Sequence, residues 1–207
     1  MKGFGTPVRI LAVLVPIGLG AGVAHAQSTS LAIGSVSGTA VAEKVGAAFG
    51  EWKYTLTVSW STGATQALSH LDVRLPLAAC ECVCSQFFIG VDEPAGTMDG
   101  FHNGRRCSIG CDAAFLCRGD PSIPGDEGPI IKYEPRDEEC EPGPIGSAVV
   151  AFYTDWPPAA VTTPNDYLLV KYGTKSLSGS LTGDLPGCRC ATSVEPKSWG
   201  SIKIMFH

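Results

Sequence analysis

Cysteine is the residue type in this chain with the greatest capacity for chemistry, either as disulfides or as metal ligands. The chain has nine cysteines, namely Cys80, Cys82, Cys84, Cys107, Cys111, Cys117, Cys140, Cys188 and Cys190. Structural zinc sites favour two to four residues between paired ligands, whereas single residues separate the first three cysteines. We therefore expect disulfides rather than zinc. The odd number leaves at least one cysteine without an intramolecular partner, and spacing alone does not fix the connectivity.

The positions of the first three cysteines bear on how they pair. In a strand, Cys80, Cys82 and Cys84 would point to one face, because side chains alternate with a period of two. Each could then reach a different partner elsewhere in the chain. Bonds among the three are the least favoured pairings.

Carboxylates form a second candidate group. Seven of them lie close together in the sequence, often next to Gly or Pro: Asp92, Glu93, Asp99, Asp112, Asp120, Asp126 and Glu127. Oxygen-rich loops of this kind bind calcium outside cells, so a calcium site is the alternative to a chain without a cofactor. The EF-hand pattern is absent, and a solvated acidic loop is the favoured interpretation.

The sequence offers little for nucleophilic or acid-base catalysis. Behind the first 26 residues the only histidines are His70, His102 and His207, and neither a G-x-S-x-G elbow nor an H-E-x-x-H helix occurs. His102, close to Asp99, is the best acid-base candidate and supports a secreted hydrolase as a second alternative. We expect no enzymatic activity.

The first 26 residues have the parts of a cleaved signal peptide. A basic start with Lys2 and Arg9 precedes an apolar run over residues 10–23, and Ala24-His25-Ala26 offers a small-x-small cleavage site. We therefore expect a mature chain from Gln27, in the periplasm, at the cell surface or secreted, where cysteines oxidise. No later run is apolar for long enough to span a membrane as a helix.

The charge of the mature chain limits the partners it can have. Cleavage of the leader would remove Lys2 and Arg9. Of the 15 basic residues, 13 then remain against 20 acidic residues, which gives a net charge of −7. This balance argues against binding a nucleic-acid backbone. The expected partner is a protein or a glycan at the cell surface.

Alternating apolar and polar residues predict a chain of β-strands. Over residues 53–60, Tyr54, Leu56, Val58 and Trp60 share one face, and residues 71–75 alternate in the same way, so we expect these two strands to be antiparallel neighbours. Further expected strands cover residues 30–41, 86–91, 147–154, 167–172, 176–181 and 201–206. A short helix over residues 40–49 is a weaker alternative, because Gly46 lies in its middle. The pattern predicts an all-β, antiparallel β-sandwich, either Ig-like or jelly-roll-like.

One segment departs from this pattern. Residues 93–144 are rich in Gly, Pro, Asp, Glu and Cys and show hardly any apolar alternation. We expect an irregular insertion there, held by cysteines. Because long loops in compact domains are commonly functional, it is the first place to look for a binding surface.

Several short motifs resemble those of uncharacterised bacterial secreted or cell-surface domains. They are the strand Tyr54-Thr55-Leu56-Thr57-Val58, then Leu68-Ser69-His70-Leu71-Asp72, Leu75-Pro76, Leu169-Val170-Lys171-Tyr172-Gly173 and Gly187-Cys188. The resemblance covers about residues 52–190 and implies an extracellular β-sandwich without a known activity. The segment at 93–144 has no counterpart in it.

The C-terminal residues 196–207 allow two interpretations. Trp199-Gly200-Ser201-Ile202-Lys203 resembles the endings of some predicted exported bacterial proteins, which implies a sorting tail. Alternatively, Ile202, Ile204 and Phe206 mark a last edge strand. Together these observations predict one domain over residues 27–195, a disulfide-stabilised structural or binding module of the bacterial surface. A metal-dependent binding domain, with calcium or zinc, is the alternative.

Overall fold

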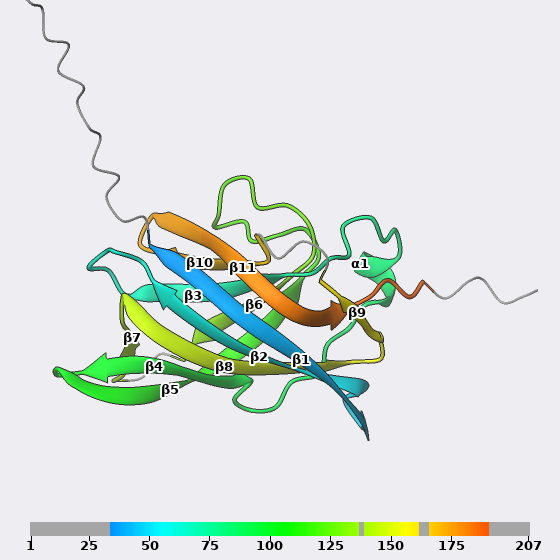
Figure 1. The fold of residues 1–207 in the computed structure, drawn as a ribbon, viewed down its shortest axis with the longest axis horizontal. Coiled ribbons are helices and arrows are strands. Elements are labelled where there is room, and N and C mark those ends of the chain that lie inside the picture. Colours follow the sequence, from blue (N-terminus) through cyan, green and yellow to red (C-terminus); the bar gives the residue numbers. More distant parts are fainter. Residues whose placement is uncertain (1–33, 137–138, 162–165, 191–207) are drawn as a thin grey trace, which may run out of the picture. The chain divides into compact units, whose positions relative to one another are not determined.

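The computed structural model describes residues 34–136, 139–161 and 166–190, and the regular secondary structure of these residues is almost entirely β-strand (Figure 1). The expected leader, its cleavage site and the expected strand at 201–206 lie outside the described residues. The long strands are β1 (Ser35–Ala47), β2 (Gly50–Ser61), β3 (Leu68–Arg74), β4 (Gly96–His102), β5 (Arg105–Leu116), β6 (Ile130–Pro135), β8 (Ile145–Thr154), β10 (Leu168–Tyr172) and β11 (Lys175–Pro186). Short elements complete the set: β7 (Glu141–Pro142), β9 (Pro158–Ala160) and the helix α1 (Val83–Gln86). No helix among these described residues is long and apolar enough to cross a membrane.

The nine long strands form a closed β-barrel. Their order around the wall is β1-β2-β8-β4-β5-β6-β3-β10-β11, and β11 returns to pair with β1 in parallel, from Ser37 opposite Ser180 to Ala40 opposite Gly183. All other neighbours around the wall are antiparallel. The expected sandwich is therefore wrong, whereas the expected β content is confirmed. Inward and outward residues alternate identically in a sandwich and a barrel, so the sequence pattern does not separate them.

Glycine allows the closing strands to approach each other. Gly183 has a φ of 110°, and a Cβ at this position would collide with the carbonyl oxygen of Ala40 on β1. A Cβ at Gly179 would likewise collide with Val36. Larger residues at these positions would hold β11 away from β1, and the barrel wall would stay open there.

The barrel interior is filled with apolar side chains. The inward positions of β2 are Tyr54, Leu56, Val58 and Trp60, as the alternation predicted, and all four are buried. The Tyr54 ring stacks on Phe152 of β8 with centroids 4.9 Å apart. Because side chains occupy the lumen, sites for polar ligands belong on the outer wall.

Three local expectations are corrected by the strand pairing. β2 and β3 are not neighbours, because β2 pairs with β1 and β8 whereas β3 pairs with β6 and β10. Residues 40–49 form most of β1 and the turn after it rather than a helix, and Gly46 takes its φ of 59° where the β1–β2 register shifts between Lys44 and Ala47. The run at 86–91 contributes the end of α1 and an isolated bridge at Gly90. Local periodicity does not encode which strands become neighbours.

The segment over residues 93–144, which was expected to be an irregular insertion, supplies three strands of the barrel wall. They are β4, β5 and β6, and the inward residues Met98, Ile109, Ile131 and Tyr133 on them are fully buried. Polar residues and glycines between these apolar positions mask the alternation in the sequence. Among the described residues of this segment, the longest irregular part is the loop between β5 and β6.

Four disulfides join eight of the nine cysteines. They are Cys80–Cys188, Cys82–Cys190, Cys84–Cys117 and Cys107–Cys140. The first three cysteines each reach a different partner, as expected, but they lie in a turn and in α1 rather than in a strand. Three bonds tie this turn to the end of β5 and to the chain after β11. By the chain-entropy account each such bond stabilises the fold by about 2–4 kcal/mol.

The remaining cysteine, Cys111, lies inside the barrel with a fully buried side chain. Burial, with a smaller effect of the Asp112 charge, raises the pKa of the thiol to about 11. The thiol therefore stays protonated at neutral pH and is a poor nucleophile. It behaves as a small apolar core residue.

We predict that the oxidised native protein shows no accessible thiol and that the denatured protein shows one per chain. Native Cys111 is shielded by the barrel, and the other cysteines are bonded. The measurement is an Ellman titration with and without 6 M guanidinium chloride, with a Cys111→Ser variant as the zero-thiol control. Three or more thiols in the denatured wild type would contradict the pairing.

Candidate functional site

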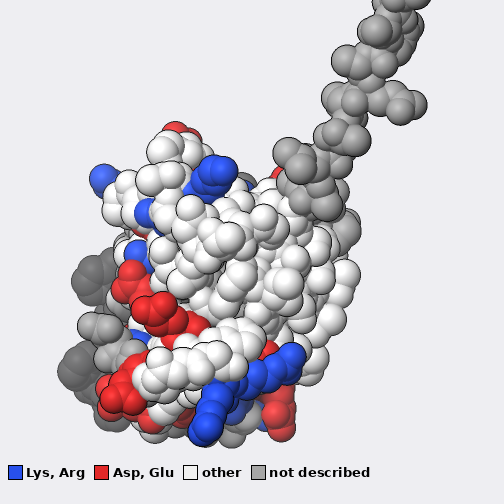
Figure 2. Space-filling model, turned by 90° about the vertical axis from the view of Figure 1, so that its left-hand side faces the viewer, with Lys and Arg blue, Asp and Glu red and all other residues white. Residues whose placement is uncertain are grey.

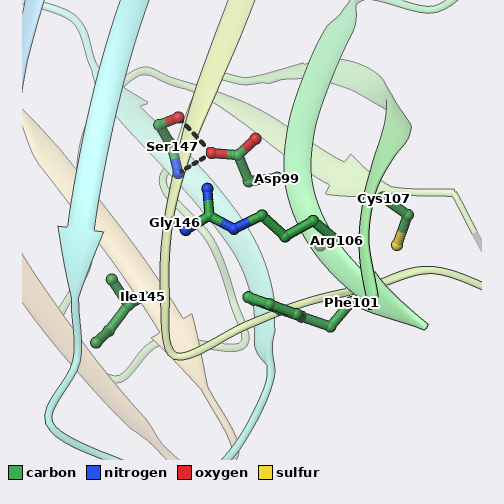
Figure 3. A pocket seen from close by; sticks show the side chains of 8 residues that line it. Asp99, Phe101, Arg106, Cys107, Ile145, Gly146 and Ser147 are labelled. Atoms are coloured by element: carbon green, nitrogen blue, oxygen red, sulfur yellow. Dashed lines mark hydrogen bonds between the residues drawn. The ribbon is translucent and has the colours of Figure 1, made fainter. Parts of the chain in front are cut away.

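A shallow pocket lies on the outer wall of the barrel, between β4, β5 and β8 (Figure 3). Its cavity volume is about 250 Å³. It is lined by Asp99, Gly100, Phe101, Arg106, Cys107, Ile145, Gly146 and Ser147. Asp99 and Phe101 are two residues apart on β4, so both point outward from the wall, and Arg106 is the cross-strand neighbour of Phe101 on β5.

One side of the pocket is polar. The Asp99 Oδ2 atom accepts hydrogen bonds from the Ser147 hydroxyl at 2.6 Å and from the Ser147 backbone amide at 3.1 Å. Figure 3 shows the Arg106 side chain reaching across the pocket toward Gly146 and this pair. Within the described part of the chain, the Arg106 guanidinium makes no ion pair or hydrogen bond. The pocket thus offers an oriented carboxylate and a guanidinium whose donors remain available.

The other side of the pocket is apolar. The Phe101 ring and the Ile145 side chain lie there, and 41% and 66% of these residues are exposed. Figure 3 shows both on the side of the pocket opposite the Asp99–Ser147 hydrogen bonds. The Cys107 sulfur points away from the cavity and is bonded to Cys140. An exposed aromatic ring next to hydrogen-bonding groups is an arrangement that suits an amphipathic ligand.

Two glycines before and in β8 shape the floor of this pocket. The Trp60 indole nitrogen donates a hydrogen bond of 2.9 Å to the Gly143 carbonyl, which fixes the chain before β8 on the barrel core. A Cβ at Gly146 would lie 2.7 Å from the Trp60 ring, and a Cβ at Gly143 would lie 2.9 Å from the Phe101 ring. Both positions therefore need glycine for the two rings to pack as they do.

Hydroxyl side chains cover the wall beside the pocket. The strand register aligns Ser180 of β11, Ser37 of β1, Ser59 of β2 and Ser147 of β8 in one cross-strand row, which ends at the pocket. At about 4.8 Å between strands, this serine row is about 14 Å long. The next row aligns Thr182, Thr39, Thr57 and Val149. No residue in either row is charged.

Figure 2 shows that the charged residues are unevenly distributed over the face it draws. Lys, Arg, Asp and Glu gather on part of this face, and a broad continuous region has none of them. The surface therefore contains uncharged areas large enough to contact a neutral ligand.

The seven carboxylates named in the sequence analysis have different partners. Asp92 accepts a hydrogen bond from the Tyr153 hydroxyl at 2.9 Å, and Arg136 pairs with both Asp112 and Glu93. Asp120, Asp126 and Glu127 lie in the loop between β5 and β6, and only Asp99 lines the pocket. His102 contacts the Glu139 backbone oxygen rather than Asp99. Sequence proximity alone did not indicate which of these groups share a site.

Sequence reasoning missed a buried polar cluster. His70 and Asp72 lie on β3, two residues apart, and Asp120 from the β5–β6 loop covers them. Burial, strengthened by the charge of Asp120, raises the pKa of Asp72 to about 8, and burial with the charge of Lys132 lowers the pKa of His70 to about 4. Both side chains are therefore neutral at pH 7 in the metal-free protein. The spacing of two residues between His70 and Asp72 indicates that both side chains share one face of a strand. Nothing in the sequence places Asp120 above them.

Comparisons with known proteins give little further guidance. No protein-family model matches the chain, and no curated protein matches it. Among solved structures, a family IIIa CBD from Clostridium cellulolyticum aligns with a TM-score of 0.39 and 11% sequence identity, over 70% of this chain and 96% of that one. A TM-score of this size assigns neither a fold family nor a function. The resemblance to bacterial secreted domains stays a prediction.

We predict that Gly146→Ala destabilises the protein by about 1–3 kcal/mol, because its Cβ would overlap the packed Trp60 ring. Urea unfolding followed by Trp fluorescence measures the change. Ser147→Ala is the matched control on the same strand and should cost less than about 1 kcal/mol, since it removes only a surface hydrogen bond. Equal stability of Gly146→Ala and wild type would contradict the packing described here.

Proposed function

We propose that this protein is an extracellular, disulfide-stabilised binding module that binds a glycan at the pocket between β4, β5 and β8. The observation that supports the proposal most directly is the composition of that pocket. An exposed Phe101 ring faces an oriented Asp99 carboxylate and the Arg106 guanidinium, which has no partner among the described residues, across a single small cavity. A sugar ring has an apolar face that can pack on Phe101, and it has hydroxyls that can form hydrogen bonds with Asp99 and Arg106.

The chemistry of each group suits a sugar ligand. The aromatic face of Phe101 accepts the C–H face of a sugar ring, which is apolar and carries partial positive charge. Asp99 accepts hydrogen bonds from hydroxyl donors, and Arg106 donates several in a fixed fork. The volume of about 250 Å³ is below the usual range for drug-sized ligands, and it suits one ring rather than a large cofactor.

The serine row supports an extended ligand. Ser180, Ser37, Ser59 and Ser147 lead away from the pocket across four adjacent strands, and their hydroxyls both donate and accept hydrogen bonds. A polysaccharide with one ring against Phe101 would continue along this uncharged row. The barrel wall holds the row in place, so little ordering is needed on binding.

Other features favour binding over hydrolysis. Retaining and inverting glycosidases use two carboxyl groups across the scissile bond, whereas among the described residues Asp99 alone brings a carboxylate to the pocket lining. The predicted signal peptide and the four disulfides fit an extracellular location. The proposal therefore retains the expectation of a module without catalysis.

We predict that the wild-type protein binds at least one polysaccharide and that Phe101→Ala and Asp99→Asn each weaken this binding at least tenfold. The first change removes the stacking surface, and the second removes the charge of the acceptor. A glycan array and pull-downs on cellulose, chitin, xylan and peptidoglycan identify the ligand, and calorimetry gives the affinities.

Phe88→Ala is the matched control for this experiment. Phe88 is 71% exposed but does not line the pocket, so its removal tests whether any exposed aromatic ring contributes. Its affinity should equal that of the wild type. Absence of binding to every glycan, or unchanged affinity in Phe101→Ala, would refute the proposed function.

A further inference from the structure

The buried cluster of His70, Asp72 and Asp120 lies at a different place from the pocket, on the outer side of β3 beneath the β5–β6 loop. His70, Asp72 and Asp120 are 4%, 0% and 1% exposed, so all three are removed from solvent. His70 and Asp72 point outward from the wall, whereas their neighbours Leu71 and Val73 point into the barrel core. The loop, which the Cys84–Cys117 bond anchors at its start, turns these outward positions into an interior site.

The polar atoms of the three side chains converge. His70 Nε2 lies 2.7 Å from Asp120 Oδ2 and 3.7 Å from Asp72 Oδ2, and one donor atom from each residue falls within 4.8 Å of the others. Among the described residues, none of these atoms has a hydrogen-bond partner of good geometry, and neither oxygen of Asp72 has one. A fully buried carboxyl group without a partner is rare, because its desolvation is not offset.

The surrounding groups hold the ligands without satisfying them. The Ser122 backbone amide donates to Asp120 Oδ1 at 2.7 Å, which orients the carboxylate and leaves its Oδ2 atom facing His70 and Asp72. Lys132 is engaged by Glu134 at 2.6 Å and stays 3.5 Å from Asp120 Oδ2, beyond a strong hydrogen bond. Such outer hydrogen bonds are typical of carboxylates that bind metal ions.

A second set of contacts fixes the loop that carries Asp120. Arg74 pairs with Asp126 at 2.7 Å, and the other oxygen of Asp126 accepts the Asp120 amide at 2.9 Å. Lys171 donates to the Ser122 carbonyl at 2.9 Å. The loop is therefore fastened on both sides of the cluster, and the three ligands are held in place before any ion binds.

We propose that His70, Asp72 and Asp120 form a binding site for one divalent transition-metal ion, for which Zn²⁺ is the best fit. Imidazole nitrogen and carboxylate oxygen are both donors that zinc accepts in proteins, at about 2.0–2.2 Å from the ion. In a tetrahedral site of that size, ligand atoms lie about 3.4 Å apart, which falls within the observed spread. The two carboxylates offset the divalent charge, and the nearby Lys132 ammonium is offset by its ion pair with Glu134.

The same donor set does not suit the calcium considered in the sequence analysis. Calcium takes six to eight oxygen ligands, whereas the group found among the described residues has one imidazole nitrogen and two carboxylates. A second group of possible ligands consists of three cysteines that lie close together, Cys80, Cys82 and Cys190. All three form disulfides, so they provide no thiolate for a metal ion in the oxidised protein. The cluster at β3 is therefore where we expect zinc to bind.

The test is zinc binding to the oxidised, EDTA-treated and dialysed full-length protein, by calorimetry and by metal analysis after gel filtration. We expect one Zn²⁺ per chain. Zinc at about one hundred times its Kd should raise the melting temperature by at least about 5 °C, because binding stabilises only the folded state. Calcium at the same concentration should leave the melting temperature unchanged.

Two variants and a matched control assign the binding to this cluster. Asp72→Asn and His70→Gln each keep the side-chain volume close to that of the original and should weaken zinc binding at least 100-fold. Asp112→Asn, an exposed carboxylate paired with Arg136, should bind zinc as the wild type does. Less than 0.2 Zn²⁺ per wild-type chain, or full binding in either folded cluster variant, would overturn the proposal. Neither result depends on the glycan pocket.

Discussion

The parallel pairing of β1 with β11 is the contact on which the rest of this structure depends. It joins the two ends of a continuous sheet, so that each long strand of the described wall pairs with a neighbour on both sides. Closure also creates one enclosed lumen, which Tyr54, Phe152 and the other inward residues fill. Gly179 and Gly183 make the pairing of β11 with β1 possible, because a side chain at either position would collide with β1.

Closure decides where function can be located. Because the lumen is packed, outward side chains of the wall carry the polar chemistry, and strand register decides which of them meet. Register aligns Ser37, Ser59 and Ser147 beside the pocket, and it sets Lys132 opposite Asp72 at the buried cluster. The pocket is lined by residues of β4, β5 and β8, whereas at the buried cluster the β5–β6 loop supplies Asp120 over β3. Strands hold the groups of both sites in place, and the loop adds the third group of the buried cluster.

Local residue pattern encodes some elements of this fold and not others. β2 was predictable because four large apolar residues alternate with hydroxyl residues, and the oxidised state of the cysteines followed from their spacing and the predicted leader. Strand neighbours were not predictable, since β2 pairs with β8 rather than with β3, and the alternation does not record register. The buried cluster was hidden for the same reason. His70 and Asp72 read as solvent-facing residues until Asp120, from a loop without periodicity, is placed above them.

The charged side chains of the pocket are exposed to solvent, whereas those of the buried cluster are not. This difference in burial indicates different roles for the two sites. At the pocket, Asp99 and Arg106 stay hydrated, so their charges cost little and can exchange water for ligand hydroxyls. At the cluster, Asp72 is fully buried, and a carboxylate in such surroundings is neutralised by a proton or by a cation. The disulfide and the ion pairs that fasten the β5–β6 loop hold this costly arrangement closed. An ion bound there would join the β5–β6 loop to the barrel wall, which is a structural role. The open pocket instead suits a ligand that binds reversibly.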